Sequence, residues 1–358
     1  MISLTPGPTP IPDFITQVLQ QPLLYHRSEK FKELYSETTD LLRKYFLASK
    51  EHRILCITGS GTNAMELLVA NLPLSKKLLI PTFGKFSQRW AEIAAAYSFD
   101  YTILNYAWGD YPKVSDIIAA LEKDPSIQVL CLTHSETSTA TRIDVEQIAF
   151  YARKLRPDVL ILVDGITSVG AMPFYTELWE IDAAITSSQK ALGCPPGMSF
   201  VSISQRYIEH AQPCGYAYNL QKYLENDAKN LTPFTPATQI LMAVYMSLKY
   251  LLNIGLPQVW NTTHTLAQYT RNEVQKLGLE LCSKQPCDSL TAFYLPQNIS
   301  ASQIISAVYQ ETGILLGNGQ GQWKNKIIRI AHMGYVQPQM IETAIQAIEK
   351  NILSLADR

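Results

Sequence analysis

Short apolar runs alternate with amphipathic segments through the first 250 residues of the chain. Bounded by polar or turn residues, the runs lie at 53–58, 76–83, 101–106, 127–134 and 158–165. Strands that are apolar throughout are buried on both faces, which is typical of a parallel sheet with helical crossovers. The pattern therefore predicts a large α/β domain with a mostly parallel sheet flanked by helices.

The spacing of the elements changes after one long predicted helix. This helix spans 235–254, with Thr235 and Pro236 at its start and Gly255 at its end. Beyond it we expect helices near 257–277, 301–312 and 337–355, and strands at 289–295 and 326–332. That order predicts a smaller C-terminal α+β domain.

The first residues of the chain predict an N-terminal arm in addition to the two domains. Prolines at positions 6, 8, 10 and 12 cannot join a helix interior or a central strand. They indicate an extended arm that lies across another part of the molecule, and a helical pattern follows from about residue 14 to 50. We therefore divide the chain into an arm (1–14), a large domain (15–250) and a small domain (251–358).

Charge and composition narrow the possible partners. The 30 basic and 31 acidic residues nearly cancel, which argues against a nucleic-acid or membrane-surface partner and favours small molecules. The start lacks a signal-peptide pattern and no run reaches eighteen apolar residues, so we expect a cytoplasmic protein. The six cysteines form no CxxC pair, so we expect no metal site, and most thiols reduced and buried.

Residues Ser60, Gly61 and Thr62 follow a predicted strand and open a predicted helix. Backbone N–H groups and two hydroxyls at the positive end of a helix suit a phosphate. The same residues also serve as an ordinary helix cap in many proteins.

Two charged residues stand at the ends of later strands. Asp164 ends the run at 158–165 and is either a carboxylate that faces a cationic ring nitrogen or a helix cap. Lys190 follows the predicted strand 181–188 and is either a desolvated, nucleophilic amine or an ordinary solvent-facing lysine. Together with the phosphate cradle they meet the three requirements of pyridoxal 5'-phosphate: a phosphate anchor, a partner for the ring nitrogen and an amine for the aldehyde.

Motifs along the whole chain resemble one enzyme family. They are TPGPTPIP at the start, GSGTNAMELL, FGKFSQRW, THSETSTAT, LVDGITSVGAMPF, SSQKALGCPPGM, TPFTPAT and IIRIAHMGY. The chain is similar to the class V, fold-type I pyridoxal-phosphate aminotransferases of the alanine–glyoxylate, serine–glyoxylate and serine–pyruvate group. The resemblance implies a seven-stranded sheet and transfer of an amino group, with ping-pong kinetics, from an alanine- or serine-type donor to a 2-oxo acid such as glyoxylate or pyruvate.

The resemblance also implies roles for single residues around the cofactor. Lys190 would bind the cofactor aldehyde and move a proton at the substrate Cα, and Asp164 would pair with the ring nitrogen. Phe86 stands where the family stacks a tryptophan on the ring, unless it is simply a core residue. The residues that match phosphate and ring-oxygen contacts are Ser60, Gly61, Thr62, Gln189 and Thr137.

Further matches imply a substrate site and a homodimer. Arg329 would clamp the substrate carboxylate, the alternative being a structural salt bridge, and Gly7 would line the substrate site. Thr235 matches a residue that reaches the phosphate from the neighbouring subunit. We regard His134 as a satisfied structural histidine rather than a base.

Two positions depart from the family pattern. Ala140 occupies the glycine position of the Thr-Ser-Thr-Ala turn, so that loop is expected to differ. Thr232 replaces an aromatic residue that often contacts the phosphate, which removes one expected contact.

Three alternatives stay open at this level. A cysteine desulfurase shares the fold but needs a mobile cysteine in the second domain, where Cys282 and Cys287 stand, and usually a histidine in place of Gln189. A 2-aminoethylphosphonate transaminase would suit the same motifs. The chain could also be a non-catalytic cofactor-binding subunit, resembling the small subunit of a cyanobacterial soluble hydrogenase.

Overall fold

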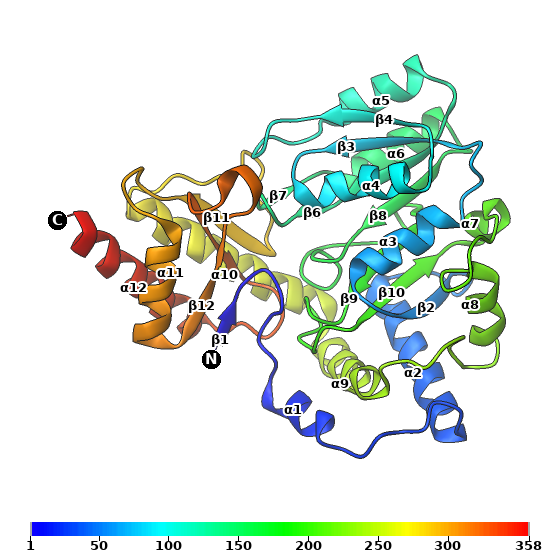
Figure 1. Cartoon of the computed structure of the whole chain (residues 1–358), viewed down its shortest axis with the longest axis horizontal. Helices are drawn as coiled ribbons and strands as arrows, with labels where there is room; N and C mark the ends of the chain where they lie inside the picture. The colour runs from blue at the N-terminus through cyan, green and yellow to red at the C-terminus, as the bar shows by residue number, and fades with distance from the viewer. Residues whose placement is uncertain (1, 357–358) are drawn as a thin grey trace.

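The computed structural model describes residues 2–356, and within them the larger sheet has seven strands in the order β2-β10-β9-β8-β5-β3-β4 (Figure 1). The strands are β2 (Arg53–Thr58), β3 (Lys77–Thr82), β4 (Tyr101–Asn105), β5 (Ile127–Thr133), β8 (Leu160–Asp164), β9 (Ala183–Ser187) and β10 (Met198–Ile203). Strand β10 is antiparallel to both of its neighbours, and the other neighbouring pairs are parallel. The predicted mostly parallel α/β sheet is confirmed.

Helices cover both faces of this sheet, as the apolar strands require. Along β8, Leu160 and Leu162 pack into one hydrophobic cluster, and Ile161 and Val163 pack into the other. The helices of the two layers are α2 (Glu29–Phe46), α5 (Val114–Lys123), α6 (Val145–Leu155) and α9 (Thr238–Ile254) on one side, and α3 (Gly61–Ala70), α4 (Lys85–Ala96), α7 (Gln205–His210) and α8 (Leu220–Asp227) on the other.

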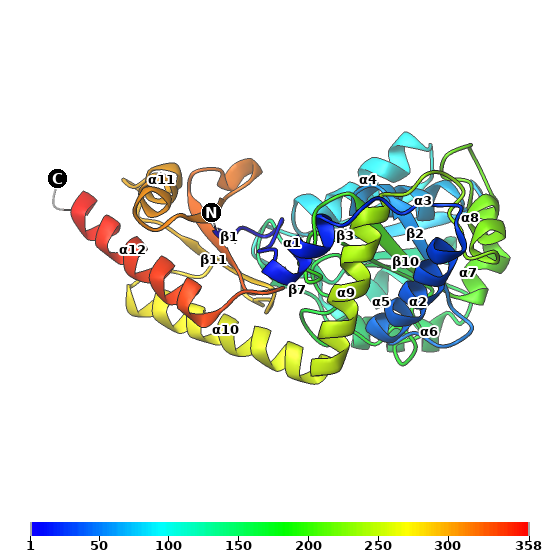
Figure 2. The same cartoon turned by 90° about the horizontal axis from the view of Figure 1, so that it is seen from below.

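A second, smaller sheet has the order β1-β12-β13-β11 and its own hydrophobic cluster. Its strands are β1 (Ile2–Leu4), β11 (Leu290–Tyr294), β12 (Ile314–Asn318) and β13 (Ile327–Ala331), and its helices are α10 (Leu256–Lys276), α11 (Ala301–Thr312) and α12 (Pro338–Ala356). Figure 2 shows α10 running from the end of α9 to the small sheet, alongside α12. A short 3₁₀ turn, η1 (Gly321–Trp323), and a small hairpin, β6 (Ser135–Glu136) and β7 (Thr141–Arg142), complete the elements.

Three sequence predictions need correction or addition. The helical pattern at 14–50 is two helices, α1 (Asp13–Leu19) and α2, and the Ser28 side chain caps the second by accepting a hydrogen bond from the Phe31 N–H. Helix α9 begins at Thr238, so Pro236 precedes it instead of lying in its first turn. Strands β1, β10 and β12 were not predicted from the sequence, and β1 and β12 are only three and five residues long.

The arm joins the two sheets (Figure 1). Its first residues form β1, which pairs in parallel with β12 of the small sheet. Further along, the Thr9 N–H donates to the Gln189 carbonyl at 3.1 Å, and the Thr9 hydroxyl donates to the Lys190 carbonyl at 2.7 Å. The extended arm therefore fixes the position of the small sheet relative to Lys190. The domain boundary near residue 250 stays a prediction.

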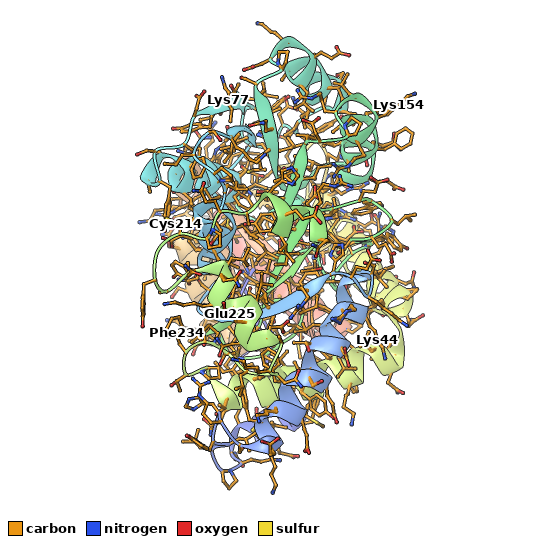
Figure 3. The ribbon with its side chains drawn as sticks, turned by 90° about the vertical axis from the view of Figure 1, so that its right-hand side faces the viewer. Lys44, Lys77, Lys154, Cys214, Glu225 and Phe234 are labelled. Carbon is orange, nitrogen blue, oxygen red and sulfur yellow. The ribbon has the colours of Figure 1, made fainter. Side chains whose placement is uncertain are left out.

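Within residues 2–356, no single helix has both the length and the hydropathy needed to cross a membrane. Helices α9 and α10 reach that threshold only when taken together, and they are bent by 89° at the break between them. All six cysteines are free thiols. Five are buried, as expected, and Cys214 is exposed near α8 (Figure 3).

Candidate active site

The carboxyl ends of β8 and β9 and the start of α3 surround a cavity of about 110 Å³, called the small cavity below. Its lining comprises Ser60, Gly61, Thr62, Phe86, Arg89, Ser135, Thr137, Asp164, Ile166, Thr167, Gln189 and Lys190. All the residues that the sequence predicted around the cofactor are in this set except Thr235. The segments that follow β2, β3, β5, β8 and β9 bring them to one edge of the sheet.

Asp164 is the last residue of β8 and is buried. One carboxylate oxygen accepts a hydrogen bond from the Ile166 N–H at 2.9 Å. Burial raises the pKa of Asp164 to about 6, although the bond from Ile166 opposes this shift. A cationic group in the small cavity would return the carboxylate to its charged form, because an opposite charge favours ionisation.

Lys190 lies in a turn that is held by several backbone bonds. The Gly193 N–H donates to the Lys190 carbonyl, and the Cys194 N–H donates to the Ser188 carbonyl, both at 2.9 Å. Gly193 has φ +58°, and a Cβ there would come within 2.3 Å of the Tyr335 ring, so the turn requires glycine. The rigid turn fixes where the lysine side chain starts.

Lys190 is half-buried, and its amine donates a hydrogen bond to the Pro6 carbonyl of the arm. Burial lowers the pKa of Lys190 to about 8; Asp164 opposes the shift, and the positive charges of Arg329 and Arg89 add to it. A substantial fraction of the amine is therefore neutral and nucleophilic near pH 8.

The start of α3 forms a cradle at one side of the small cavity. Gly61 and Thr62 are the first residues of the helix, where backbone N–H groups have no acceptor within the helix. A Cβ on Gly61 would come within 2.2 Å of the end of the Ile166 side chain, so a larger residue would require that side chain to move. The buried side-chain oxygen of Gln189 has no hydrogen-bond partner among the described residues. The free backbone N–H groups of the cradle suit a ligand with several acceptor oxygens.

A second cavity of about 730 Å³, the large cavity, adjoins the small one. Phe86, Thr137 and Lys190 line both. The remaining lining of the large cavity comes from Ser3 and residues 5–11 of the arm, from residues 315–320 on and after β12, and from Arg329 on β13. Lys190 is therefore positioned to act on molecules in either cavity.

Arg329 lies on β13 and is 6% exposed. Its guanidinium donates to the carbonyls of Asn318 and Thr137, both at 2.9 Å. No ion pair within 4.0 Å among residues 2–356 includes Arg329, so the alternative of a structural salt bridge is not found in the described chain. Burial lowers its pKa to about 10, and the nearby charge of Glu136 opposes the shift. This unpaired cation suits the carboxylate of a ligand.

Gly7 brings the arm against the lysine. Its φ is +125°, and a Cβ there would lie 2.3 Å from the Lys190 Nζ. Only glycine permits this close approach. Gly7 lies in the wall of the large cavity, and its place at a substrate site stays a prediction.

Thr235 lies outside both cavities of this chain. Its hydroxyl is 3.5 Å from the His26 Nε2, and its neighbour Phe234 is exposed (Figure 3). Thr232 is buried and its hydroxyl donates to the Phe234 carbonyl at 2.7 Å. The predicted role of Thr235 concerns a second subunit and stays a prediction.

His134 lies behind the site, with its ring against Phe174 and Trp179. Burial lowers its pKa to about 3, so the ring is neutral. Its Nδ1 is buried without a hydrogen-bond partner in the described chain, so the expectation of a fully satisfied histidine is wrong in that detail. His134 lines neither of the two cavities, which agrees with the expectation that it is not the base.

Ala140 has φ 56°, in the left-handed region that favours glycine. Its carbonyl accepts a hydrogen bond from the Cys287 N–H at 2.9 Å. The loop therefore keeps a glycine-like conformation at the position where the family pattern has glycine.

Sequence reasoning missed one charged residue that lines the small cavity, Arg89, and one that supports it from behind, Glu136. Glu136 is fully buried and accepts hydrogen bonds from the backbone N–H groups of Phe86 and Ser87, at 3.0 and 2.6 Å, which ties the start of α4 to β6. Arg89 lines the small cavity, and its Nη1 donates to the Thr62 hydroxyl at 3.0 Å. The signal for Arg89 was present in FGKFSQRW, since a residue three positions after Phe86 shares its face of a helix.

The cysteines expected of a desulfurase are not at the site. Cys282 and Cys287 are buried, and burial raises the pKa of both thiols. Neither lines the small or the large cavity.

Comparisons with known proteins agree with this geometry. The model of the family Aminotransferase class-V matches residues 13–333. The chain is 32% identical to a soluble hydrogenase small subunit of Synechococcus, over 98% of this chain and 93% of the relative. It is 28% identical to a serine–glyoxylate aminotransferase of Methylorubrum extorquens, over 97% and 90% of the two chains.

A solved structure is equally similar. The aspartate aminotransferase of subgroup IV from Thermus thermophilus has a TM-score of 0.92 and 31% identity, with 99% of this chain and all of that chain covered. The family match, the near complete coverage and the arrangement of Lys190, Asp164 and Arg329 lead to one conclusion. The chain belongs to the class V aminotransferase family and is a transaminase of fold type I.

Proposed function

We propose that this transaminase holds pyridoxal 5'-phosphate in the small cavity and moves an amino group from an alanine- or serine-type donor to a 2-oxo acid such as glyoxylate or pyruvate. One observation carries the proposal. The Lys190 amine lies where the two cavities join, with Asp164 in the lining of the small cavity and Arg329 in that of the large cavity.

The residues of the small cavity fit the proposed cofactor. Gly61 leaves room at the start of α3, where free N–H groups and the Ser60 and Thr62 hydroxyls suit the phosphate. Asp164 provides a buried carboxylate for the ring nitrogen, and Phe86 offers an aromatic face to the ring. Thr137 would lie near the ring oxygen. When bound, the cofactor supplies an electron sink for the bond electrons of the substrate carbon.

Side chains of this chain would orient the substrate and move the proton. Arg329 would hold the substrate carboxylate through paired N–H groups and so orient the reacting carbon toward Lys190. The Lys190 amine, neutral in part near pH 8, would take the proton from that carbon and hold it on Nζ for return during the same half-reaction. Both substrates would use the same cavity, so the product of the first leaves before the second enters.

The charges of the large cavity favour a substrate with one carboxylate. Of the described residues that line this cavity, only Lys190 and Arg329 carry a charge. Ser3, Thr5 and Asn318 add polar groups that can bind a hydroxyl. Alanine and serine meet these conditions, whereas the second carboxylate of aspartate would find no further cation among the described residues that line this cavity.

The relatives support a serine or alanine donor only in part. A serine–glyoxylate aminotransferase and an aspartate aminotransferase are similar to this chain to about the same extent. A 2-aminoethylphosphonate donor would present a phosphonate in place of the carboxylate, and a screen of donors separates these possibilities.

We further propose a homodimer with shared active sites. Thr235 lies outside the cavities of its own chain, next to the exposed Phe234. In a dimer it would contribute its hydroxyl to the phosphate in the other subunit. The alternative of a non-catalytic subunit follows from the name of the Synechococcus relative, and no feature of the described residues favours it.

The test is a donor screen with the purified protein alone. Cofactor-loaded protein is mixed with alanine, serine, aspartate, 2-aminoethylphosphonate or cysteine, and the visible absorption of the cofactor and the 2-oxo product are followed. We expect kcat/KM for alanine or serine to exceed that for aspartate by roughly 10-fold or more, because one unpaired buried charge costs at least that much. Lys190→Ala should lose turnover with every donor. No turnover with any donor would overturn the proposal, sulfide release from cysteine would favour a desulfurase, and preferred turnover of 2-aminoethylphosphonate would favour the phosphonate enzyme.

A further inference from the structure

Arg89 is a cation in the wall of the small cavity, on the first turns of α4. Its Nη1 donates to the hydroxyl of Thr62, the residue that opens the cradle together with Gly61. Its guanidinium carbon lies 4.9 Å from the centre of the Phe86 ring. The side chain therefore lies between the cradle and the ring that the cofactor is proposed to stack on.

Arg89 has no acidic partner among residues 2–356 within 4.0 Å. Other arginines that are partly or fully buried are paired: Arg53 with Asp227, Arg153 with Asp182, and Arg271 with Asp288. Arg329 at the large cavity shares the unpaired state of Arg89. A partly buried cation without a counter-charge is costly unless an anionic ligand pairs with it.

The rest of the cradle has no positive charge for a phosphate. Ser60, Thr62 and Gln189 offer neutral hydrogen-bonding groups, and Lys190 is needed for the cofactor aldehyde. A phosphate monoester carries a charge of roughly −1.5 to −2 at pH 7. Hydrogen bonds from a guanidinium to such an anion are about twice as strong as those between neutral groups.

We infer that Arg89 is the cationic partner of the phosphate monoester in the small cavity. The inference rests on the proposed function and adds to it a phosphate-binding residue on the same subunit. In the family pattern an aromatic residue at the position of Thr232 often contacts the phosphate, and this chain lacks that contact. The guanidinium of Arg89, on α4 of the same chain, would then replace it.

The competing explanation is that Arg89 only holds Thr62 and Phe86 in place. The two explanations differ in what they predict for a cofactor without phosphate. Loss of a phosphate contact weakens pyridoxal 5'-phosphate but leaves pyridoxal unaffected. Loss of a positioning contact weakens both, because Phe86 would stack on the ring of either molecule.

The experiment measures dissociation constants of both molecules for cofactor-free wild-type protein and for Arg89→Gln, by quenching of protein fluorescence. We expect Arg89→Gln to weaken pyridoxal 5'-phosphate by roughly 10- to 100-fold and pyridoxal by less than about threefold. Calorimetric titration of the cofactor-free proteins with inorganic phosphate should show the same loss. Arg43→Gln, at an arginine paired with Asp40 on α2, is the matched control and should change neither constant.

Equal losses for the two molecules, or no loss for either, would overturn the inference. If Arg89→Gln does not fold, Arg89→Lys decides, because an ammonium cannot donate two parallel N–H groups to a phosphate. The preference for pyridoxal 5'-phosphate over pyridoxal must then fall below that of the wild type, and an unchanged preference would overturn the inference. Failure of the proposed function looks different: wild-type protein itself would not retain the cofactor at Lys190.

Discussion

The small and the large cavity meet at Lys190 but are built in different ways. The small cavity takes most of its lining from short connections at the carboxyl edge of the seven-stranded sheet. The large cavity is assembled from the arm and from β12 and β13. The arm lies more than 300 residues before these two strands along the chain. The proposed cofactor site is therefore built on one sheet, whereas the proposed substrate site depends on how the arm and the small sheet lie against that sheet.

Arg329→Gln should weaken substrate binding in the large cavity and leave cofactor binding in the small cavity unchanged. The arginine donates to two carbonyls and has no acidic partner in the described chain, so its substitution removes a buried carboxylate contact. We expect a loss of roughly 2–5 kcal/mol in kcat/KM for carboxylate substrates, seen mainly in the KM. Steady-state kinetics with serine and glyoxylate measures this loss.

The control for Arg329→Gln is cofactor affinity, which should stay within about threefold of the wild type. An unchanged KM would remove Arg329 from the substrate site. A matching loss of cofactor affinity would contradict the separation of the two cavities.

The pH dependence of stability tests the small cavity. Burial lowers the pKa of Lys190 from 10.5 to about 8 in the folded, cofactor-free protein. Between these pH values the unfolded chain binds more protons at this residue than the folded chain, so the free energy of unfolding rises with pH. We expect a contribution on the order of 3 kcal/mol from pH 8 to 10.5, which Lys190→Met should remove. Urea unfolding of both proteins across that range measures it, and equal slopes would contradict a buried amine.

Asp164 should make the free energy of unfolding fall with rising pH in the acidic range, opposite to the effect of Lys190. Burial raises its pKa from 3.8 to about 6, so the folded chain binds more protons than the unfolded chain between these values. The contribution of Asp164 to the free energy of unfolding is therefore fully present below pH 3.8, and it is lost as the pH rises toward 6. The same urea series, run with Asp164→Asn as the comparison, shows the sign.

Gly7→Ala should give the smallest effect, because it moves the arm without removing a polar group. The added Cβ would come within 2.3 Å of the Lys190 Nζ, at a φ that disfavours alanine. We expect kcat/KM to fall by roughly 10- to 100-fold through misplacement of the lysine and the arm. Wild-type kinetics in this variant would show that the arm does not constrain Lys190.

Much of the small cavity could be predicted from the sequence. Ser60, Asp164 and Lys190 each end an apolar run, and strand ends of a parallel sheet converge at one edge. The roles of these three residues were predicted in full only from the resemblance of the motifs to the aminotransferase family. Arg89 and Glu136 were missed because their partners, Thr62 and the start of α4, lie 27 and about 50 residues away.

The large cavity and the outer strands were harder to predict. Strand β1 lies within the proline-rich arm, and β12 has five residues, so neither shows a clear period. Pairing of β1 with β12 joins residues 2–4 to residues 314–316, a contact that no local pattern encodes. Arg329 could be placed on a strand, but the absence of an acidic partner in the described chain is a property of the folded structure.

The central claim is that Lys190 is the amine that holds the cofactor. The most direct measurement is to reduce the cofactor-loaded protein with borohydride, digest it, and locate the added mass by mass spectrometry. The account predicts that the mass of the reduced cofactor lies on Lys190, and that Lys190→Ala carries none. Cofactor mass on another lysine, or none on the wild-type protein under conditions where the cofactor binds, would contradict it.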